Sequence, residues 1–338
     1  MEALWKTGFG SIAKKPAAGR NECFYMKSTI IKPIIIIGCP RSGTSLLFTL
    51  LSASKHLWSL YRESNLIWSD YYKFKGKHFN NESLADSDLD ETSKSFILRE
   101  FHKYALNNQY IGYFTRDHLI KHSVFNKLVG AVTDCNLLYK SLFLKEYRIV
   151  EKTPKNCFRI SFINKLFEDC KFIFIKRDGR SNINSLIEGW RVPNKYIRRQ
   201  ELDRPLNIKG YEGTYWKYVL PPNWENYVNK SLEEVCAFQW VSSNRAALEG
   251  LSKIDNSRKY TLAYEDLAEN TYDVMKNLCE YVEIPFSGEV EQLSVKPPLV
   301  NFVTKPEKDK WKKNINLIQN IYPVIDPMMK ELNYTLSF

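Results

Sequence analysis

The sequence predicts an α/β fold in which a central parallel sheet lies between two helical layers, with helical and loop insertions. Three observations lead to this class. Short apolar runs that suit buried strands alternate with segments of helical spacing. The alternation continues along most of the chain, as in parallel sheets covered on both faces. Polar residues able to bind anions or move protons follow each apolar run.

Four strands are expected in chain order. KPIIIIG supplies the first, directly after a proline, and the others follow the same pattern. The expected strands are 34–37, 147–150, 171–176 and 260–264. Helical spacing lies between them in 44–60, 156–169 and 181–190. Further on, 310–332 predicts one or two amphipathic helices interrupted by Pro323 and Pro327.

The length of the chain allows one large α/β domain or two smaller ones. No linker-like stretch divides it, which favours one domain over 31–338 after a basic lead-in at 1–30. Two stretches look inserted into that domain. Residues 64–146 are polar and helical in character, and 191–235 are rich in aromatic residues and proline.

The net charge indicates what kind of partner the protein binds, and the cysteines indicate its cellular compartment. Lys and Arg number 49 against 38 Asp and Glu, and the net charge of +11 favours an anionic partner, although solubility explains it equally well. The seven cysteines are scattered without a C-x-x-C pair, as is typical of reduced thiols. Neither a signal-peptide pattern nor an apolar run of membrane-spanning length occurs, so we expect a cytoplasmic protein without a transmembrane segment.

The stretch GCPRSGTS at 38–45 is almost a phosphate-binding loop, but the lysine of that motif is missing. Thr44 and Ser45 occupy the last two positions of G-x-x-x-x-G-K-[ST]. A glycine-rich turn between a strand and a helix aims backbone N–H groups at one point, where the helix N-terminus adds positive charge. Arg41 adds a planar guanidinium that suits a phosphosulfate. The loop predicts an anion site in a P-loop-like three-layer αβα fold.

The other expected strands also end in polar residues. These residues are Glu151 and Lys152, then Arg177 and Arg180, then Tyr264 and Glu265. In open α/β sheets, ligands bind at the carboxyl ends of the strands. The sequence therefore predicts one site to which several strand ends contribute.

At this point the chain resembles the sulfotransferases that use 3′-phosphoadenosine 5′-phosphosulfate (PAPS). GCPRSGTSLL is similar to their 5′-phosphosulfate loop, and FIFIKRDGRSNINSLIEGW to their 3′-phosphate motif. EKTPKNCFRISFINKLFEDCKF and KWKKN…MMKEL resemble the bacterial and the tyrosyl-protein and carbohydrate branch. The steroid and phenol enzymes have Lys where Arg41 stands, which argues against that branch. The resemblance spans about 33–60, 148–190, 258–268 and 305–333.

The resemblance implies a nucleotide-binding role for nine residues. Those for the 5′-phosphosulfate are Arg41, Ser42, Gly43, Thr44 and Ser45. Arg177 and Ser185, at the motif's separation of eight residues, are expected to hold the 3′-phosphate. Tyr264 is expected near the adenine, and Lys305 is a weaker candidate from a loop over the nucleotide. PAPS is then the co-substrate and its desulfated form, 3′-phosphoadenosine 5′-phosphate (PAP), the product.

Sulfuryl transfer places charge on the leaving phosphate oxygen and removes a proton from the acceptor. Fixed cations meet the first need, and Arg41 and Lys152 are the candidates. A positioned base meets the second. Our candidate is Glu63, 22 residues beyond Arg41, where the chain is expected to return to the loop. Glu151 is the second candidate and His56, on the expected turn after the helix, the third.

Two acceptor groups fit this chemistry, a hydroxyl and an amine, on a small molecule or a carbohydrate. The aromatic stretch 191–228 is expected to form one wall of its site or a lid, although an apolar cluster beneath a long loop is an equal alternative. No nucleic-acid module is present. No metal site is expected, because His118 and His122 lack a third ligand and the acidic stretch 86–91 departs from a calcium loop.

Two other functions fit parts of this pattern. A nucleotide kinase or NTPase with an atypical P-loop would share the strand–loop–helix unit, but the missing lysine argues against it. Turnover without a metal would separate the two enzymes, because phosphoryl transfer usually needs Mg²⁺. A non-catalytic polyanion-binding module would bind such ligands without turnover, and it needs no carboxylate near the loop.

Overall fold

The sheet and the helices around it are seen in a computed structural model of the protein. It describes residues 28–60, 63–76, 79–107, 140, 143–192, 199–200, 202, 205–300, 303–304 and 307–335. Within these residues, six strands form the central sheet in the order β10–β7–β2–β6–β3–β4. Their bounds are Lys259–Ala263, Lys171–Lys176, Ile34–Ile37, Ile149–Lys152, Trp58–Leu60 and Ala105–Asn107. All neighbours are parallel except β4, which is antiparallel to β3.

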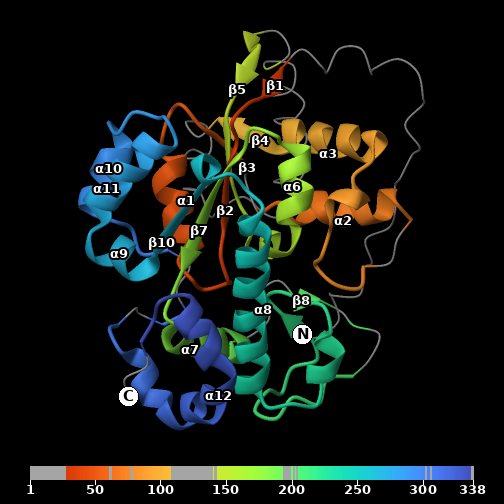
Figure 1. Ribbon diagram of the computed structural model, residues 1–338, viewed down its shortest axis with the longest axis vertical. Helices are drawn as coiled ribbons and strands as arrows, with labels where there is room; N and C mark the ends of the chain where they lie inside the picture. Colours follow the sequence, from red (N-terminus) through yellow and green to blue (C-terminus); the bar gives the residue numbers. More distant parts are fainter. Residues whose placement is uncertain are drawn as a thin grey trace, which may run out of the picture.

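Helices cover both faces of the sheet (Figure 1). On one face lie α1 (Thr44–Ser52), α9 (Tyr264–Glu269), α10 (Thr271–Tyr281) and α11 (Glu289–Val295). On the other lie α2 (Asn65–Phe74), α3 (Glu91–Tyr104), α6 (Ile160–Leu166) and the last turns of α8 (Leu232–Ser252), whose Gly250 lies against Ile160 of α6. The carboxyl ends of β2 and β7 point toward α7 (Gly179–Arg191) and α12 (Ile315–Glu331). The predicted three-layer α/β fold with a central parallel sheet is confirmed.

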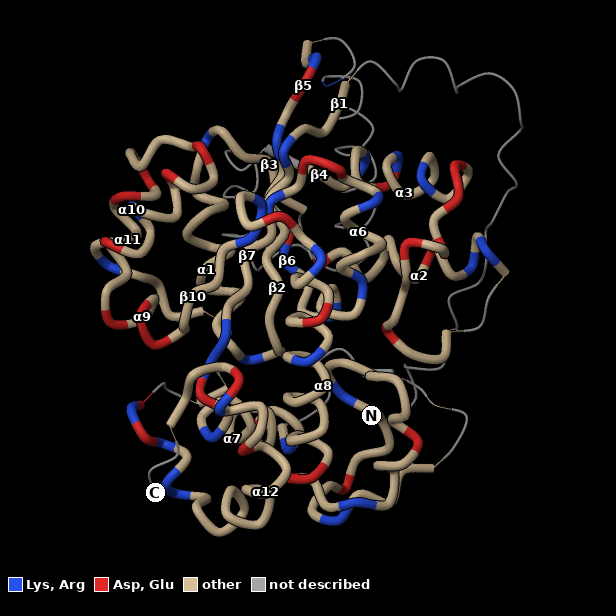
Figure 2. The backbone as a smooth tube through the Cα atoms, in the orientation of Figure 1, with Lys and Arg blue, Asp and Glu red and all other residues tan. Residues whose placement is uncertain are grey.

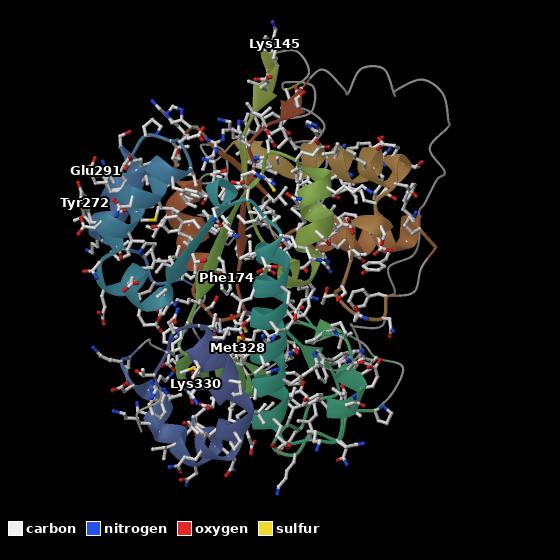
Figure 3. All side chains as sticks on the ribbon, viewed as in Figure 1. Lys145, Phe174, Tyr272, Glu291, Met328 and Lys330 are labelled. Carbon is white, nitrogen blue, oxygen red and sulfur yellow. The ribbon has the colours of Figure 1, made fainter. Side chains whose placement is uncertain are left out.

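The alternation of side chains along β2 explains the two layers. Ile34 and Ile36 belong to the apolar core shared with α1 and α10, whereas Ile35 and Ile37 belong to the core shared with α6, α7 and α8. All four isoleucines are at most 1 % exposed. A strand buried on both faces needs such an uninterrupted apolar run. Figure 3 shows Phe174 of β7 in the middle of the molecule, whereas Tyr272 and Glu291 lie at its margin.

The strand predictions are confirmed at 34–37 and 171–176 and shifted elsewhere. The strand predicted at 147–150 is divided: Tyr147 belongs to the separate strand β5 (Glu146–Tyr147), and β6 begins at Ile149 and includes Glu151 and Lys152, which were expected to follow it. The strand predicted at 260–264 starts and ends one residue earlier, and Tyr264 begins α9. The helix predicted over 44–60 is wrong beyond Ser52. Trp58–Leu60 is instead the buried strand β3, because pairing with β6 outweighs the local helical spacing.

The C-terminal prolines were predicted to interrupt the helical pattern, and this is also wrong. α12 runs continuously from Ile315 to Glu331 with Pro323 and Pro327 inside it. Its buried face, which includes Ile318, Ile325 and Met329, packs on the core that contains α8. This burial offsets the two backbone hydrogen bonds that prolines remove.

The two predicted insertions have different structures where they are described. The first, 64–146, contains α2, α3 and β4, in agreement with its helical character. The second, 191–235, contains the short strands β8 (Arg199–Gln200) and β9 (Trp216–Lys217), a 3₁₀ turn at Trp224–Tyr227 and the start of α8. Residues 1–27 lie outside the described residues, and the division into a lead-in and a single domain stays a prediction. No helix in the described part of the chain has the length and apolar character needed to cross a bilayer.

Candidate active site

The loop between β2 and α1 is closely packed from both sides. Gly43 has a φ of 98°, and a Cβ placed there would lie 2.3 Å from the Tyr264 ring. A Cβ at Gly38 would lie 2.6 Å from the carbonyl oxygen of Ile175. Arg41 also has a positive φ, of 72°. Glycine is therefore required at both positions, and the loop brings backbone N–H groups to the N-terminus of α1 as an anion site demands.

Residues of the predicted 3′-phosphate motif hold this loop directly. Nη1 of Arg177 donates to the carbonyl of Arg41 at 2.7 Å, and Nε of Arg41 donates to Oγ of Ser185 at 3.1 Å. Nδ2 of Asn182 donates to the carbonyl of Pro40 at 2.8 Å. The two motifs, separated by more than a hundred residues, thus form one structure. Figure 2 shows Lys and Arg positions along the backbone at this end of the sheet.

The surroundings of Arg177 fit a negatively charged ligand. Its guanidinium stacks on the Tyr264 ring at 4.3 Å from the centroid, and burial lowers its pKa. Its Nε and the hydroxyl of Ser42 are buried without a hydrogen-bond partner among the described residues. Buried donors of this kind are rare in proteins unless a ligand or water satisfies them. Arg177 therefore has a donor available for an oxygen of an anion.

A pocket of about 130 Å³ opens beside the loop. Of the predicted nucleotide-binding residues, it is lined by Arg41, Gly43, Thr44, Ser45, Arg177, Ser185 and Tyr264. The hydroxyl-bearing Ser42 is buried within the loop and does not line it. Lys305 lies outside the described residues.

Sequence reasoning missed several residues of the pocket. These are chiefly Ser181, Asn184, Glu188, Thr304, Lys310 and Trp311. The members from α7 were detectable in principle, because 181, 184, 185 and 188 share one helical face with the predicted Ser185. Thr304 lies outside the described helices and strands, and Lys310 and Trp311 belong to a short 3₁₀ turn (Lys310–Asn314), so no periodic pattern marks these three residues.

The candidate catalytic residues meet at the edge of the loop. Nζ of Lys152, at the end of β6, donates to Oε1 of Glu63 at 2.6 Å and to Oγ of Ser45 at 3.2 Å. Nδ2 of Asn65 donates to the other oxygen of Glu63 at 2.9 Å. The Lys152 side chain is 9 % exposed and that of Glu63 is 37 % exposed. Glu63 is thus oriented from two sides and still open to an incoming molecule.

Glu151 points to the other face of β6 and has a different environment. It is fully buried and accepts hydrogen bonds from Ser64, Thr153 and Asn156. Burial raises the pKa of its carboxyl group. Ser64 is the residue after Glu63, and its backbone N–H also donates to Oγ1 of Thr153. Glu151 therefore holds the backbone next to Glu63 and has no exposed surface for an acceptor.

His56 lies on the turn between α1 and β3, as expected, but at the opposite end of α1 from the loop. A helix of this length separates its two ends by about 13 Å. The structure thus brings Glu63, Lys152 and the loop together and leaves His56 apart.

The aromatic residues of the second insertion pack on Trp190 of α7 and on Phe238 of α8 as well as on one another. Trp216 is fully buried between Trp190 and Trp224, with ring centroids 5.5 and 5.8 Å away. Its Nε1 donates to the carbonyl of Val219. Trp216 therefore has no surface for an acceptor, whereas Tyr215 is partly exposed. Tyr196 lies outside the described residues, and an acceptor wall in 191–228 stays a prediction.

No group of side chains suited to a metal ion is found among the residues that the structure describes. His118 and His122 lie outside them. In the acidic stretch, Asp90 caps α3 by accepting from the backbone N–H of Ser93 at 2.7 Å. Asp88 accepts from the N–H of Ala85 at 2.9 Å. These two carboxylates therefore have structural partners.

The chain matches the sequence model of one protein family and is similar to several solved structures. A sequence model described as "Sulfotransferase family" matches residues 33–288, about three quarters of the chain. No curated protein matches the sequence. Among solved structures, sulfotransferase STF9 from Mycobacterium avium is 14 % identical, with 91 % of this chain and 78 % of that chain covered and a TM-score of 0.48. The sulfotransferase domain from the curacin biosynthetic pathway is 16 % identical, with 91 % and 99 % covered and a TM-score of 0.45. On the strength of the sequence match over 33–288, the chain belongs to the sulfotransferase family.

Proposed function

We propose that the protein transfers the sulfuryl group of PAPS to a hydroxyl or amine of a small-molecule or carbohydrate acceptor. The observation that carries this proposal is the position of Lys152, whose ammonium contacts both the loop, through Ser45, and the carboxylate of Glu63. An anion-binding loop, a fixed cation and an accessible base in one place are the parts that sulfuryl transfer requires. A binding module has no need for the last of these.

The donor would bind along the loop and the pocket. Backbone N–H groups of the loop from Ser42 to Ser45, the hydroxyls of Thr44 and Ser45, and Arg41 would hold the 5′-phosphosulfate. Arg177 and Ser185 would hold the 3′-phosphate, and Tyr264, which stacks on Arg177, would lie next to the nucleoside. A free guanidinium N–H on the buried Arg177 supports this assignment.

The transfer would proceed in line. Glu63 takes the proton of the acceptor as the acceptor oxygen or nitrogen forms a bond to sulfur. The bond between sulfur and the phosphate oxygen breaks, and its electron pair stays on PAP. Lys152 and Arg41 stabilise the charge that develops on that leaving oxygen, because preorganised cations in a partly buried site act with little reorganisation.

The test is a direct assay. The purified protein is incubated with isotopically labelled PAPS and pools of candidate acceptors, and products are searched for by the mass of an added sulfuryl group. We expect a sulfated product, and we expect its formation to be lost when Glu63 is replaced by Gln. Hydrolysis of PAPS without any acceptor product, or binding without turnover, would contradict the proposal.

A further inference from the structure

A carboxylate lines the pocket in which the proposed donor binds. Glu188 lies three residues after Ser185 on α7 and faces the same pocket as Arg41 and Arg177. A negative charge in this place repels a phosphate, with an energy that grows as water is excluded. The proposed function gives this carboxylate no task.

The carboxylate is paired with a cation that also lines the pocket. Nζ of Lys310 lies 2.7 Å from Oε1 of Glu188 and 2.8 Å from Oε2. Oγ1 of Thr304 donates to the same carboxylate at 2.6 Å, and Lys310 contacts Thr304 as well. The side chains of Lys310 and Glu188 are only 19 % and 20 % exposed. Because the pair is half-buried, each charge strongly influences what the other binds.

The position of Lys310 does not depend on Glu188 alone. Next to it, Trp311 is buried against the guanidinium of Arg180, 4.7 Å from the ring centroid. Nδ2 of Asn314 donates to Oδ1 of Asn184 on α7 at 2.7 Å. These contacts hold the 310–314 turn on α7 independently of the ion pair. Neutralising Glu188 should therefore leave the ammonium of Lys310 beside the pocket.

We propose that Glu188 and Lys310 are specificity-determining residues for the 3′ side of the nucleotide. Without ligand, Glu188 neutralises Lys310, which limits repulsion among the cations of the pocket. A 3′-phosphate competes with Glu188 for Lys310, whereas a nucleotide that lacks this phosphate leaves the pair intact. Lys310 thus favours 3′-phosphorylated nucleotides over their simpler analogues, and Glu188 limits the strength of that preference. This inference rests on the proposed function, which supplies a donor with a 3′-phosphate.

The experiment compares two ligands on matched variants. PAP and adenosine 5′-monophosphate (AMP) differ by the 3′-phosphate, and both are titrated by calorimetry. The variants are Glu188→Gln, Lys310→Gln, the double variant and Lys312→Gln. Lys312 is the control: it belongs to the same turn, its partner Asp309 is exposed, and it does not line the pocket. Thermal unfolding establishes that each variant is folded.

The expected changes are in the ratio of the two affinities. Lys310→Gln leaves Glu188 without its main partner, and PAP should weaken by about ten- to a hundredfold while AMP changes by less than about threefold. Glu188→Gln frees Lys310, and PAP should tighten by about three- to tenfold relative to AMP. The ratio of the affinities for PAP and AMP in the double variant should lie between the ratios of the two single variants. In Lys312→Gln this ratio should equal that of the parent.

The outcomes separate this inference from the proposed function. If the parent protein does not bind PAP more tightly than AMP, the proposed donor is wrong. If the parent prefers PAP but Lys310→Gln and Glu188→Gln shift both ligands equally, the pair only supports the local structure and the inference is wrong. Should Glu188→Gln fail to fold, Lys310→Gln with Lys310→Arg decides, because only the charge-retaining arginine should then preserve the preference for PAP.

Discussion

Lys152 and Glu63 form an ion pair of 2.6 Å between the end of β6 and the residue that precedes the Ser64 cap of α2. The same ammonium donates to Ser45 at 3.2 Å. The proposed base and the proposed anion loop are therefore joined by one side chain. Displacement of Lys152 toward a developing charge on the leaving oxygen would release the carboxylate of Glu63 to accept a proton.

The first prediction concerns Glu63. Glu63→Gln keeps the size of the side chain and the contact with Lys152 but loses basicity, so kcat should fall by about 10²–10⁴, the usual share of a general base. The affinity for PAP should stay within about twofold, because the base acts in the chemical step. The pH–rate profile of the parent should show an acidic limb that the variant lacks.

The control is Asp70→Asn, which also replaces a carboxylate by an amide, on α2 at an exposed ion pair with Lys73. A normal kcat in Glu63→Gln would remove this residue from the mechanism.

The second prediction concerns Arg177. Arg177→Ala removes a cation from the proposed 3′-phosphate site, and the affinity for PAP should fall by about ten- to a hundredfold in a calorimetric titration. Because Arg177 also holds the carbonyl of Arg41, adenosine 5′-phosphosulfate, which lacks the 3′-phosphate, should weaken as well, but by about threefold or less. Arg245→Ala, at an exposed ion pair with Glu331, should leave both ligands unchanged. Equal losses for the two ligands would assign Arg177 to the loop alone.

The third prediction concerns the metal requirement. In the proposed mechanism, Arg41, Lys152 and the loop N–H groups neutralise the leaving phosphate, a task that phosphoryl-transfer enzymes usually give to Mg²⁺. Turnover should therefore persist in excess EDTA, and added Mg²⁺ should change kcat by less than about twofold. Activity that disappears in EDTA and returns with Mg²⁺ would instead favour a nucleotide kinase or NTPase.

The fold and part of the candidate site could be predicted because their sequence patterns are local. A buried run such as IIII specifies a strand on its own, and the spacing of Arg177 and Ser185 is fixed within one strand–helix unit. Trp58–Leu60 could not be recognised, because its strand state depends on pairing with β6, which lies about ninety residues away. The pair of Glu188 and Lys310 was missed for the same reason, since its members are 122 residues apart.

The last prediction separates Glu151 from Glu63. Glu151 is fully buried, so Glu151→Gln should change kcat by less than about tenfold and should keep the acidic limb of the pH–rate profile. The substitution Glu151→Gln should instead change the stability of the folded protein. Burial raises the pKa of this carboxyl group above its value in the unfolded chain, so the folded state binds the proton more tightly. The stability that the protonated group contributes is present below the unfolded pKa and is lost as the pH rises through the folded pKa.

Because Gln cannot ionise, the Glu151→Gln variant should not lose this stability as the pH rises. The Tm of Glu151→Gln minus the Tm of the parent should increase as the pH rises above the usual pKa of a glutamate carboxyl, about 4.3, until the folded group has ionised. Scanning calorimetry across that range, with Asp70→Asn as a control at an exposed ion pair, measures the difference directly. If the difference is flat and Glu151→Gln instead loses the acidic limb together with about a hundredfold in kcat, Glu151 is the base and Glu63 only orients Lys152. The contacts argue against that outcome, because Ser64, Thr153 and Asn156 already surround Glu151, whereas the Glu63 carboxylate is 37 % exposed beside the loop.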